Sequence, residues 1–277
     1  MHTENIENLF TIAAQATAIG AATLSKTRPG SVQHKGDRDL VTDIDLGIQR
    51  DIADFLARTT PGIPLLAEES VWQPEIGAAE WLWVLDPIDG TSNFVHGLPL
   101  CAVSLALLRH GRTAVAVIDA PLLGRTYHAV EDNGAFLNGR PIRAGNTDSL
   151  SDAVVSLGDY AVGHQAAALN QQQLALTAEL VPRVERIRMI GAATLDLAFV
   201  AEGALDGCVM LSNKPWDTAA GTLIAREAGA ILTDGRGDPH THRSASTVAA
   251  APGIAEQLGA VIRHADIPGA EHGAAMA

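Results

Sequence analysis

The segment WVLDPIDGTSNF, residues 83–94, ends an apolar run with two aspartates on either side of a Pro-Ile pair. The run predicts a buried strand, and carboxylates at its end can reach a crevice without entering the core. Asp86 and Asp89 would repel each other unless a cation lay between them, and oxygen ligands suit a hard divalent ion such as Mg²⁺. The alternative is a turn in which both aspartates make only local hydrogen bonds.

Further acids follow an apolar run or open a helical pattern. Taken alone, Glu68 and Glu69 indicate a solvated strand end, and Asp217 indicates the N-cap of a helix. Asp43 and Asp45 open another helical pattern. Because they are two residues apart they do not share a helix face, so at most one is expected to point into a site. Together the acids predict one pocket assembled from loops on a rigid scaffold.

The composition is typical of a globular protein with a sizeable core, 47% apolar and 18% charged over 277 residues, folded as one domain or two intimate subdomains. Nineteen Lys and Arg against 32 Asp and Glu give a formal net charge of −13. This charge, with no basic cluster to offset it, repels nucleic acids and anionic membranes, so we expect neither as a partner. A site for a phosphorylated substrate would therefore need a local positive charge or a metal ion.

Cys101 and Cys208 are too few for a disulfide framework and favour a reducing compartment. The first ten residues, MHTENIENLF, contain neither the basic n-region of a signal peptide nor a long apolar stretch. We therefore expect a cytoplasmic protein without a signal peptide or a membrane span.

The first half of the chain predicts two helices followed by antiparallel strands. Apolar spacing indicates a helix over 4–26 and a second helix, with Thr42 or Asp43 as its N-cap, that ends before Pro61. Residues 101–139 read as several strands bounded by turn residues. The turns are expected at 109–112, 121–124 and 132–134.

The second half alternates strand and helix patterns, which is typical of an α/β layer arrangement. Strands are expected at 153–158, 185–191, 206–211, 230–234 and 246–251, and helices at 165–180, 193–203, 218–229 and 254–262. The polar stretch RAGNTDSLSD, residues 143–152, favours a boundary. We expect an N-terminal α+β subdomain over 1–147 with most of the metal ligands, a C-terminal α/β subdomain over 148–265 that completes the site, and a flexible tail over 266–277.

Five segments together resemble the inositol monophosphatase family of Mg²⁺-dependent phosphatases. DPIDGTSNF and WDTAAGTLIAREAG are similar to the family's two signatures, and LLAEES, DLVTDID and GAATLDLAFVAEG to its other site segments. The resemblance covers roughly residues 4–262. It implies the family's fold, a layered αβαβα sandwich of the α/β class with an α+β N-terminal part, and a homodimer.

The resemblance also implies a role for each matching residue. The Mg²⁺ ligands, for two ions and possibly a third near Glu68, would be Glu68, Asp86, Asp89, Asp217 and the backbone carbonyl of Ile88. Asp45 and Thr91 would orient the attacking water, with Glu68 as a third catalytic residue, and no covalent phospho-enzyme would form. The residues beside the substrate would be Asp89, Gly90, Thr91, Gly191, Ala192, Ala193, Met210 and Asp217.

Position 210 departs from the family pattern. Inositol monophosphatases usually carry a glutamate there that binds substrate hydroxyls, whereas the thioether of Met210 is a weak acceptor. The lost hydrogen bonds would have to come from Ser212, Asn213 or Lys214. We expect an inositol-type phosphate or a related polyol or sugar phosphate first, and histidinol phosphate or a nucleotide phosphate as the alternative. A catalytically silent metal-binding regulatory protein is disfavoured because every expected metal acid is present.

Overall fold

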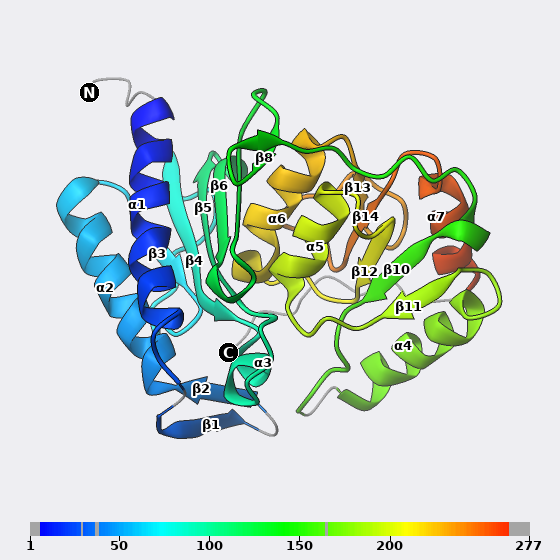
Figure 1. The fold of residues 1–277 in the computed structure, drawn as a ribbon, viewed down its shortest axis with the longest axis horizontal. Coiled ribbons are helices and arrows are strands. Elements are labelled where there is room, and N and C mark those ends of the chain that lie inside the picture. The colour runs from blue at the N-terminus through cyan, green and yellow to red at the C-terminus, as the bar shows by residue number, and fades with distance from the viewer. Residues whose placement is uncertain (1–5, 29, 37–38, 164–165, 266–277) are drawn as a thin grey trace.

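Two larger β-sheets alternate with three layers of helices in the structure, a computed structural model that describes residues 6–265 except 29, 37–38 and 164–165 (Figure 1). This arrangement confirms the expected αβαβα sandwich. The tail expected over 266–277 lies outside the described residues. Within the described ranges, every helix is too short or too polar to cross a membrane.

The first outer layer consists of α1 (Ile6–Leu24) and α2 (Asp43–Thr59), which confirms both helices expected near the N-terminus. A capping box starts α2. The Thr42 hydroxyl accepts a hydrogen bond from the backbone amide of Asp45, and the Asp45 carboxylate accepts one from the amide of Thr42 at 3.0 Å. Thr42 is therefore the N-cap, and this pairing holds the Asp45 side chain inside the protein.

The first sheet has seven strands and carries α1 and α2 on one face (Figure 1). In spatial order they are β3 (Leu65–Ala67), β4 (Trp81–Asp89), β5 (Ala102–Arg109), β6 (Arg112–Ala120), β7 (Arg125–Val130), β8 (Ala135–Leu137) and β9 (Arg140–Pro141). β3 runs parallel to β4, and the other neighbours are antiparallel. The strands end at the three predicted turns, the second of which is the 3₁₀ turn η1 (Pro121–Leu123).

The middle layer consists of α5 (Ala193–Ala201) and α6 (Pro215–Glu227), which lie between the two sheets (Figure 1). Both helices are apolar on several faces, as burial on two sides requires. They cross closely at Gly221, where a Cβ atom would lie 2.6 Å from Cβ of Leu197. Glycine thus sets the separation of the two helices.

The second sheet is covered on its outer face by α4 (Ala166–Leu180) and α7 (Ala255–His264). Its strands, in spatial order, are β11 (Arg186–Arg188), β10 (Val154–Leu157), β12 (Gly207–Met210), β14 (Thr247–Ala250) and β13 (Ile231–Thr233). β10 is parallel to both of its neighbours, whereas β14 is antiparallel to both of its own. The predicted elements are present, in a mixed sheet. The division into two subdomains stays a prediction, since one apolar core extends from the first sheet through α5 and α6 to the second.

Short elements border the site. The hairpin of β1 (Val32–Gly36) and β2 (Asp39–Thr42) leads into α2, and the short helix α3 (Thr91–Val95) follows β4 directly. The 3₁₀ turn η2 (Leu150–Asp152) lies in the polar stretch that connects the two sheets.

Candidate active site

A β-bulge at the end of β4 places Asp86 and Asp89 on one face of the sheet. In a regular strand, side chains three residues apart point to opposite faces. Asp86 pairs with Ser104 and Asp89 pairs with Ala102, so three steps on β4 match two on β5. The bulge adds one residue to β4 at the Pro-Ile pair, so the side chains of Asp86 and Asp89 point to the same face of the sheet. Both carboxylates therefore line the same space, an arrangement that depends on the bulge and not on the spacing of the motif alone.

That space is a cavity of about 240 Å³ whose lining includes five acidic residues. Its walls are Leu40, Glu68, Asp86, Ile88, Asp89, Gly90, Thr91, Ser92, Asp159, Gly191, Lys214 and Asp217. The cavity brings together all five residues expected to bind metal. Among the described residues, however, no three acidic, His or Cys side chains stand in a ready-made coordination group.

The carboxylates raise one another's pKa. Burial, followed by the charges of Glu68, Asp89, Asp217 and Asp45, holds the pKa of Asp86 well above its ordinary value. Burial also raises the pKa of Asp89 to about 6, with Glu68 adding to the effect. The Oδ1 atom of Asp86 is buried and has no hydrogen-bond partner within the described part of the chain. An unpaired buried carboxylate oxygen is costly, and a divalent cation would satisfy it.

The side chains of Asp45 and Thr91 meet at the edge of the cavity. Asp45 is fully buried, and its Oδ2 atom accepts hydrogen bonds from both the amide and the hydroxyl of Thr42. The Thr91 hydroxyl lies 3.1 Å from Asp45 Oδ1 and 2.9 Å from the carbonyl oxygen of Ile88, and can donate to either. Burial raises the pKa of Asp45, while the hydrogen bonds from Thr42 and Thr91 lower it.

Asp89 also binds the N-terminus of α5. Its Oδ2 atom accepts from the amide of Thr194 at 2.7 Å and from the Thr194 hydroxyl at 2.5 Å, and its Oδ1 accepts from the amide of Ala193 at 3.2 Å. Ala193, expected beside the substrate, thus orients Asp89, one of the acids expected to bind metal, and Ala192 is buried next to it. Sequence reasoning missed Thr194, although a hydroxyl at a helix start was the signal for it.

Gly90 and Gly191 are required by packing. Gly90 has φ 84°, and a Cβ there would lie 2.6 Å from the Leu100 carbonyl oxygen and 3.1 Å from Ala192. Gly191 has φ 75° and faces Asn93. The Asn93 amide donates to the carbonyls of Leu100 at 2.8 Å and Ile190 at 2.9 Å, so that it ties α3 to the segment before α5. These contacts fix the cavity rim between the two halves of the chain.

Three placements differ from or add to the sequence interpretation. Asp217 is the third residue of α6 and Lys214 is the N-cap, so the N-cap interpretation of Asp217 is wrong. A carboxylate in the first turn still suits the helix dipole.

Met210 is 2% exposed in the apolar core and does not line the cavity. Its role in substrate binding stays a prediction. Sequence reasoning missed Asp159 as a lining residue, and proposed Lys214 only as one possible source of substrate hydrogen bonds.

The five-layer fold is that of inositol monophosphatases of known structure. An IMPase of Thermotoga maritima superposes with a TM-score of 0.81 at 32% identity, over 94% of this chain and 98% of the other. The chain belongs to the inositol monophosphatase family, whose sequence model matches residues 4–266.

Its curated relatives carry two kinds of name. The fructose-1,6-bisphosphatase/inositol-1-monophosphatase of Thermotoga maritima is 39% identical over 75% of this chain and 76% of its own length. The Nus factor SuhB of Salmonella typhimurium is 33% identical over 92% of this chain and 96% of its own length.

Proposed function

We propose that the protein is a Mg²⁺-dependent phosphatase that hydrolyses a small phosphate monoester, with an inositol-type or related polyol or sugar phosphate as the first choice. The observation that carries the proposal is Asp86, a buried carboxylate with an oxygen that has no partner among the described residues and with other carboxylates around it. Family membership supports phosphatase chemistry. A solved IMPase/NADP phosphatase, 25% identical, is in complex with NADP and Ca²⁺, which supports a divalent cation.

The oxygen-rich lining fits Mg²⁺, and the number of ions, two and possibly a third near Glu68, is what the family resemblance implies. The carboxylates of Asp86, Asp89, Glu68 and Asp217 would hold them together with the carbonyl of Ile88. When bound, the ions supply the positive charge that attracts a phosphate ester and offsets the charge that builds up on its oxygens.

Thr91 and Asp45 would orient the attacking water. When the Thr91 hydroxyl donates to Asp45 Oδ1, its oxygen is left to accept a hydrogen bond from that water. Asp45 is held by Thr42, so the pair has little freedom to turn away. The water would attack the phosphorus as the ester P–O bond breaks, and its proton would pass through Thr91 toward the buried Asp45 carboxylate. The departing alkoxide would take up a proton from solvent water.

Other residues would bind the ester. Among the described residues, Lys214 is the one cation that lines the acidic cavity, and its ammonium group can contact the phosphate. Gly90 and Thr91 carry backbone amides at the cavity wall, which suits a phosphate oxygen. Gly191, which lies next to Gly90, and Asp159 also line the cavity, and the alcohol part of the ester would lie beside them.

We also propose a homodimer, as the family resemblance implies. Exposed apolar side chains at Leu98 and Met189 support it, because Asn93 donates to the carbonyls of Leu100 and Ile190 and so brings these two segments together. Light scattering after size exclusion should give twice the 28.9 kDa chain mass. A cytoplasmic location and the absence of nucleic-acid and membrane partners stay predictions.

A phosphate-release panel tests the activity. Inositol, sugar, nucleotide and histidinol phosphates are each incubated with Mg²⁺ or with EDTA. We expect release with Mg²⁺ alone, and a loss of at least about 100-fold in kcat for Asp86→Asn, because the site loses its central charge. Asp51→Asn, an exposed aspartate on α2, is the matched control and should keep full activity. Absence of Mg²⁺-dependent release from every compound would refute the phosphatase and favour a silent regulatory protein.

A further inference from the structure

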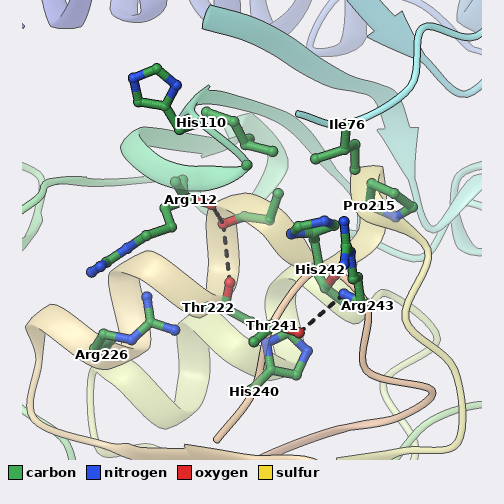
Figure 2. A pocket seen from close by; sticks show the side chains of 15 residues that line it. Ile76, His110, Arg112, Pro215, Thr222, Arg226, His240, Thr241, His242 and Arg243 are labelled. Atoms are coloured by element: carbon green, nitrogen blue, oxygen red, sulfur yellow. Dashed lines mark hydrogen bonds between the residues drawn. The ribbon is translucent and has the colours of Figure 1, made fainter. Parts of the chain in front are cut away.

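A second cavity, of about 500 Å³, lies along another face of α6 (Figure 2). Pro215, Thr218 and Thr222 of α6 line it, whereas Asp217 faces the acidic cavity. Its volume is in the range of small-molecule sites. Its lining is basic, with the side chains of Arg112, Arg226, Arg243, His110, His240 and His242. In the described part of the chain, no aspartate or glutamate lines it.

The arginines surround the cavity from three different segments. Figure 2 shows Arg112, from the start of β6, and Arg226, from the end of α6, on one side, and Arg243 on the other. Leu108, Ile76 and Pro215 add an apolar wall. A basic cavity is unexpected in a chain with a net charge of −13.

The charge of Arg226 is not neutralised by its neighbours. Its guanidinium makes no hydrogen bond or ion pair with any residue that the structure describes. The two nearest acids already have partners: Glu131 pairs with Arg112 at 3.1 Å, and Glu227 accepts from the amides of Asp132 at 2.9 Å and Gly134 at 2.8 Å. Burial and the like charge of Arg112 lower the pKa of Arg226 by more than the charges of Glu131 and Glu227 raise it, so an anion placed beside Arg226 would be bound favourably.

His240 adds a polar group without charge. Burial, and the neighbouring Arg226 charge, lower the pKa of His240 to about 4, so it is neutral at pH 7. Its Nε2 atom lies 3.2 Å from Asn213 Oδ1 and 3.1 Å from Thr247 Oγ1, which keeps the ring in place. His240 therefore adds no positive charge to that of the arginines that line the cavity.

We propose that this cavity is a second binding site, for a small organic anion that carries a phosphate group. The guanidinium of Arg226 is matched to phosphate oxygens, with which it forms paired charge-assisted hydrogen bonds. A phosphate dianion offsets the charges of both Arg226 and Arg243, which a single carboxylate does not. The apolar wall would contact the organic part of the ligand. The site does not depend on the metal or on the phosphatase activity.

Calorimetric titration of the full chain with pyrophosphate, in EDTA, tests the proposal. Without cations the acidic cavity repels anions, so the heat reports the basic cavity. We expect saturable binding that weakens at least tenfold in Arg226→Gln and in Arg243→Gln. Arg50→Gln removes the same charge from the exposed surface of α2 and should bind as the wild type does. Unchanged melting temperatures of the ligand-free variants exclude misfolding.

Three results would overturn the site. One is the absence of saturable heat with the wild type, and another is an equal loss in Arg50→Gln, which would indicate a general charge effect. The third is tighter binding of a short RNA than of pyrophosphate, which would assign the cavity to a nucleic acid. Tricarballylate, a tricarboxylate, separates the anion classes: we expect binding at least tenfold weaker than that of pyrophosphate, and equal binding would refute the phosphate assignment.

Discussion

At the scale of single residues, Thr194 links Asp89, at the end of β4, to the middle helices. Its hydroxyl and its amide both donate to one oxygen of Asp89, at 2.5 and 2.7 Å. These hydrogen bonds lower the pKa of Asp89 and so offset part of the effect of its burial. Thr194 is itself fully buried, so its hydroxyl has no water to replace that partner. The orientation of Asp89 therefore depends on a residue that need not touch metal or substrate.

Thr194→Val removes the hydroxyl and keeps the shape of the side chain. We expect it to lower the free energy of unfolding by about 1–3 kcal/mol, because a charge-assisted hydrogen bond is lost in a buried place. The Mg²⁺ concentration for half-maximal activity should rise as Asp89 loses its orientation, whereas Thr194→Ser should stay close to the wild type. Thermal unfolding and a Mg²⁺ titration of activity measure both effects. Equal behaviour of the valine and serine variants would contradict this role for the hydroxyl.

Met210 illustrates that the role of a residue in a motif depends on the direction of its side chain. A glutamate at this position would replace a thioether that is 2% exposed and lies against Gly158. We expect Met210→Glu to lower the melting temperature by several degrees, because the carboxylate would be buried without a partner. A preserved melting temperature, together with a substrate ranking shifted toward inositol 1-phosphate, would instead show that position 210 reaches the cavity. Differential scanning calorimetry and the phosphate-release panel distinguish the two outcomes.

At the scale of elements, the crossing of α5 and α6 positions acids from both halves of the site. α5 presents the amides that bind Asp89, and α6 carries Asp217 in its first turn. Gly221 sets their separation, since a Cβ there would approach Cβ of Leu197 to 2.6 Å. A wider crossing would therefore displace one acid relative to the other.

Two glycine substitutions test this crossing. Gly221→Ala should destabilise the protein by roughly 1–3 kcal/mol through overpacking, and should raise the Mg²⁺ concentration for half-maximal activity. Gly47→Ala, in α2, is the matched control: no atom lies within 4 Å of the added Cβ, so helix propensity should stabilise the protein by about 0.5–1 kcal/mol. Urea unfolding measures both changes. The same sign for both variants would show that the helix separation at Gly221 is not critical.

The sequence predicted the helices, the strands and the acidic residues of the site more completely than the residues that contact them. The helical spacing of 4–26 and the strand run before Asp86 predict local structure, because apolar periodicity acts within one element. Thr194, by contrast, contacts Asp89 only because α5 packs against the end of β4, and the two residues lie about one hundred positions apart in the chain. For the same reason the sequence does not reveal that Met210 points into the core. The direction of β14, which makes the second sheet mixed, also depends on packing and not on local pattern.

At the scale of the whole molecule, the site is an acidic cavity in a chain of net charge −13. Its walls come from the first sheet, from α6 and from the segment before α5, so folding itself brings the carboxylates together. Holding these carboxylates together in their charged form costs free energy, as the raised pKa values of Asp86 and Asp89 indicate. Binding of Mg²⁺ would offset much of this free-energy cost, because a ligand that binds only the folded state stabilises that state.

The stability of the metal-free protein should consequently fall as pH rises. Asp89 has a pKa of about 6 in the folded protein, against about 3.9 in an unfolded chain, and that of Asp86 is also raised, so the folded state binds more protons between these values. The stabilisation is fully present below about pH 4 and is lost as pH rises through the folded pKa values. His240, with its lowered pKa of about 4, acts in the opposite direction, but only below about pH 6.5.

Thermal unfolding in EDTA at pH 5.5 and at pH 7.5 measures this linkage. We expect the melting temperature to fall by at least about 1 °C, because Asp89 alone loses roughly 0.8 kcal/mol of stabilisation over this interval and Asp86 adds to the loss. Saturating Mg²⁺ should reduce the fall, because the cation replaces the proton as the partner of the carboxylates. Asp86→Asn should show a smaller fall in EDTA and little response to Mg²⁺, whereas Asp51→Asn should behave as the wild type does. A wild-type melting temperature that rises with pH in EDTA would mean that these carboxylates do not share a strained acidic site.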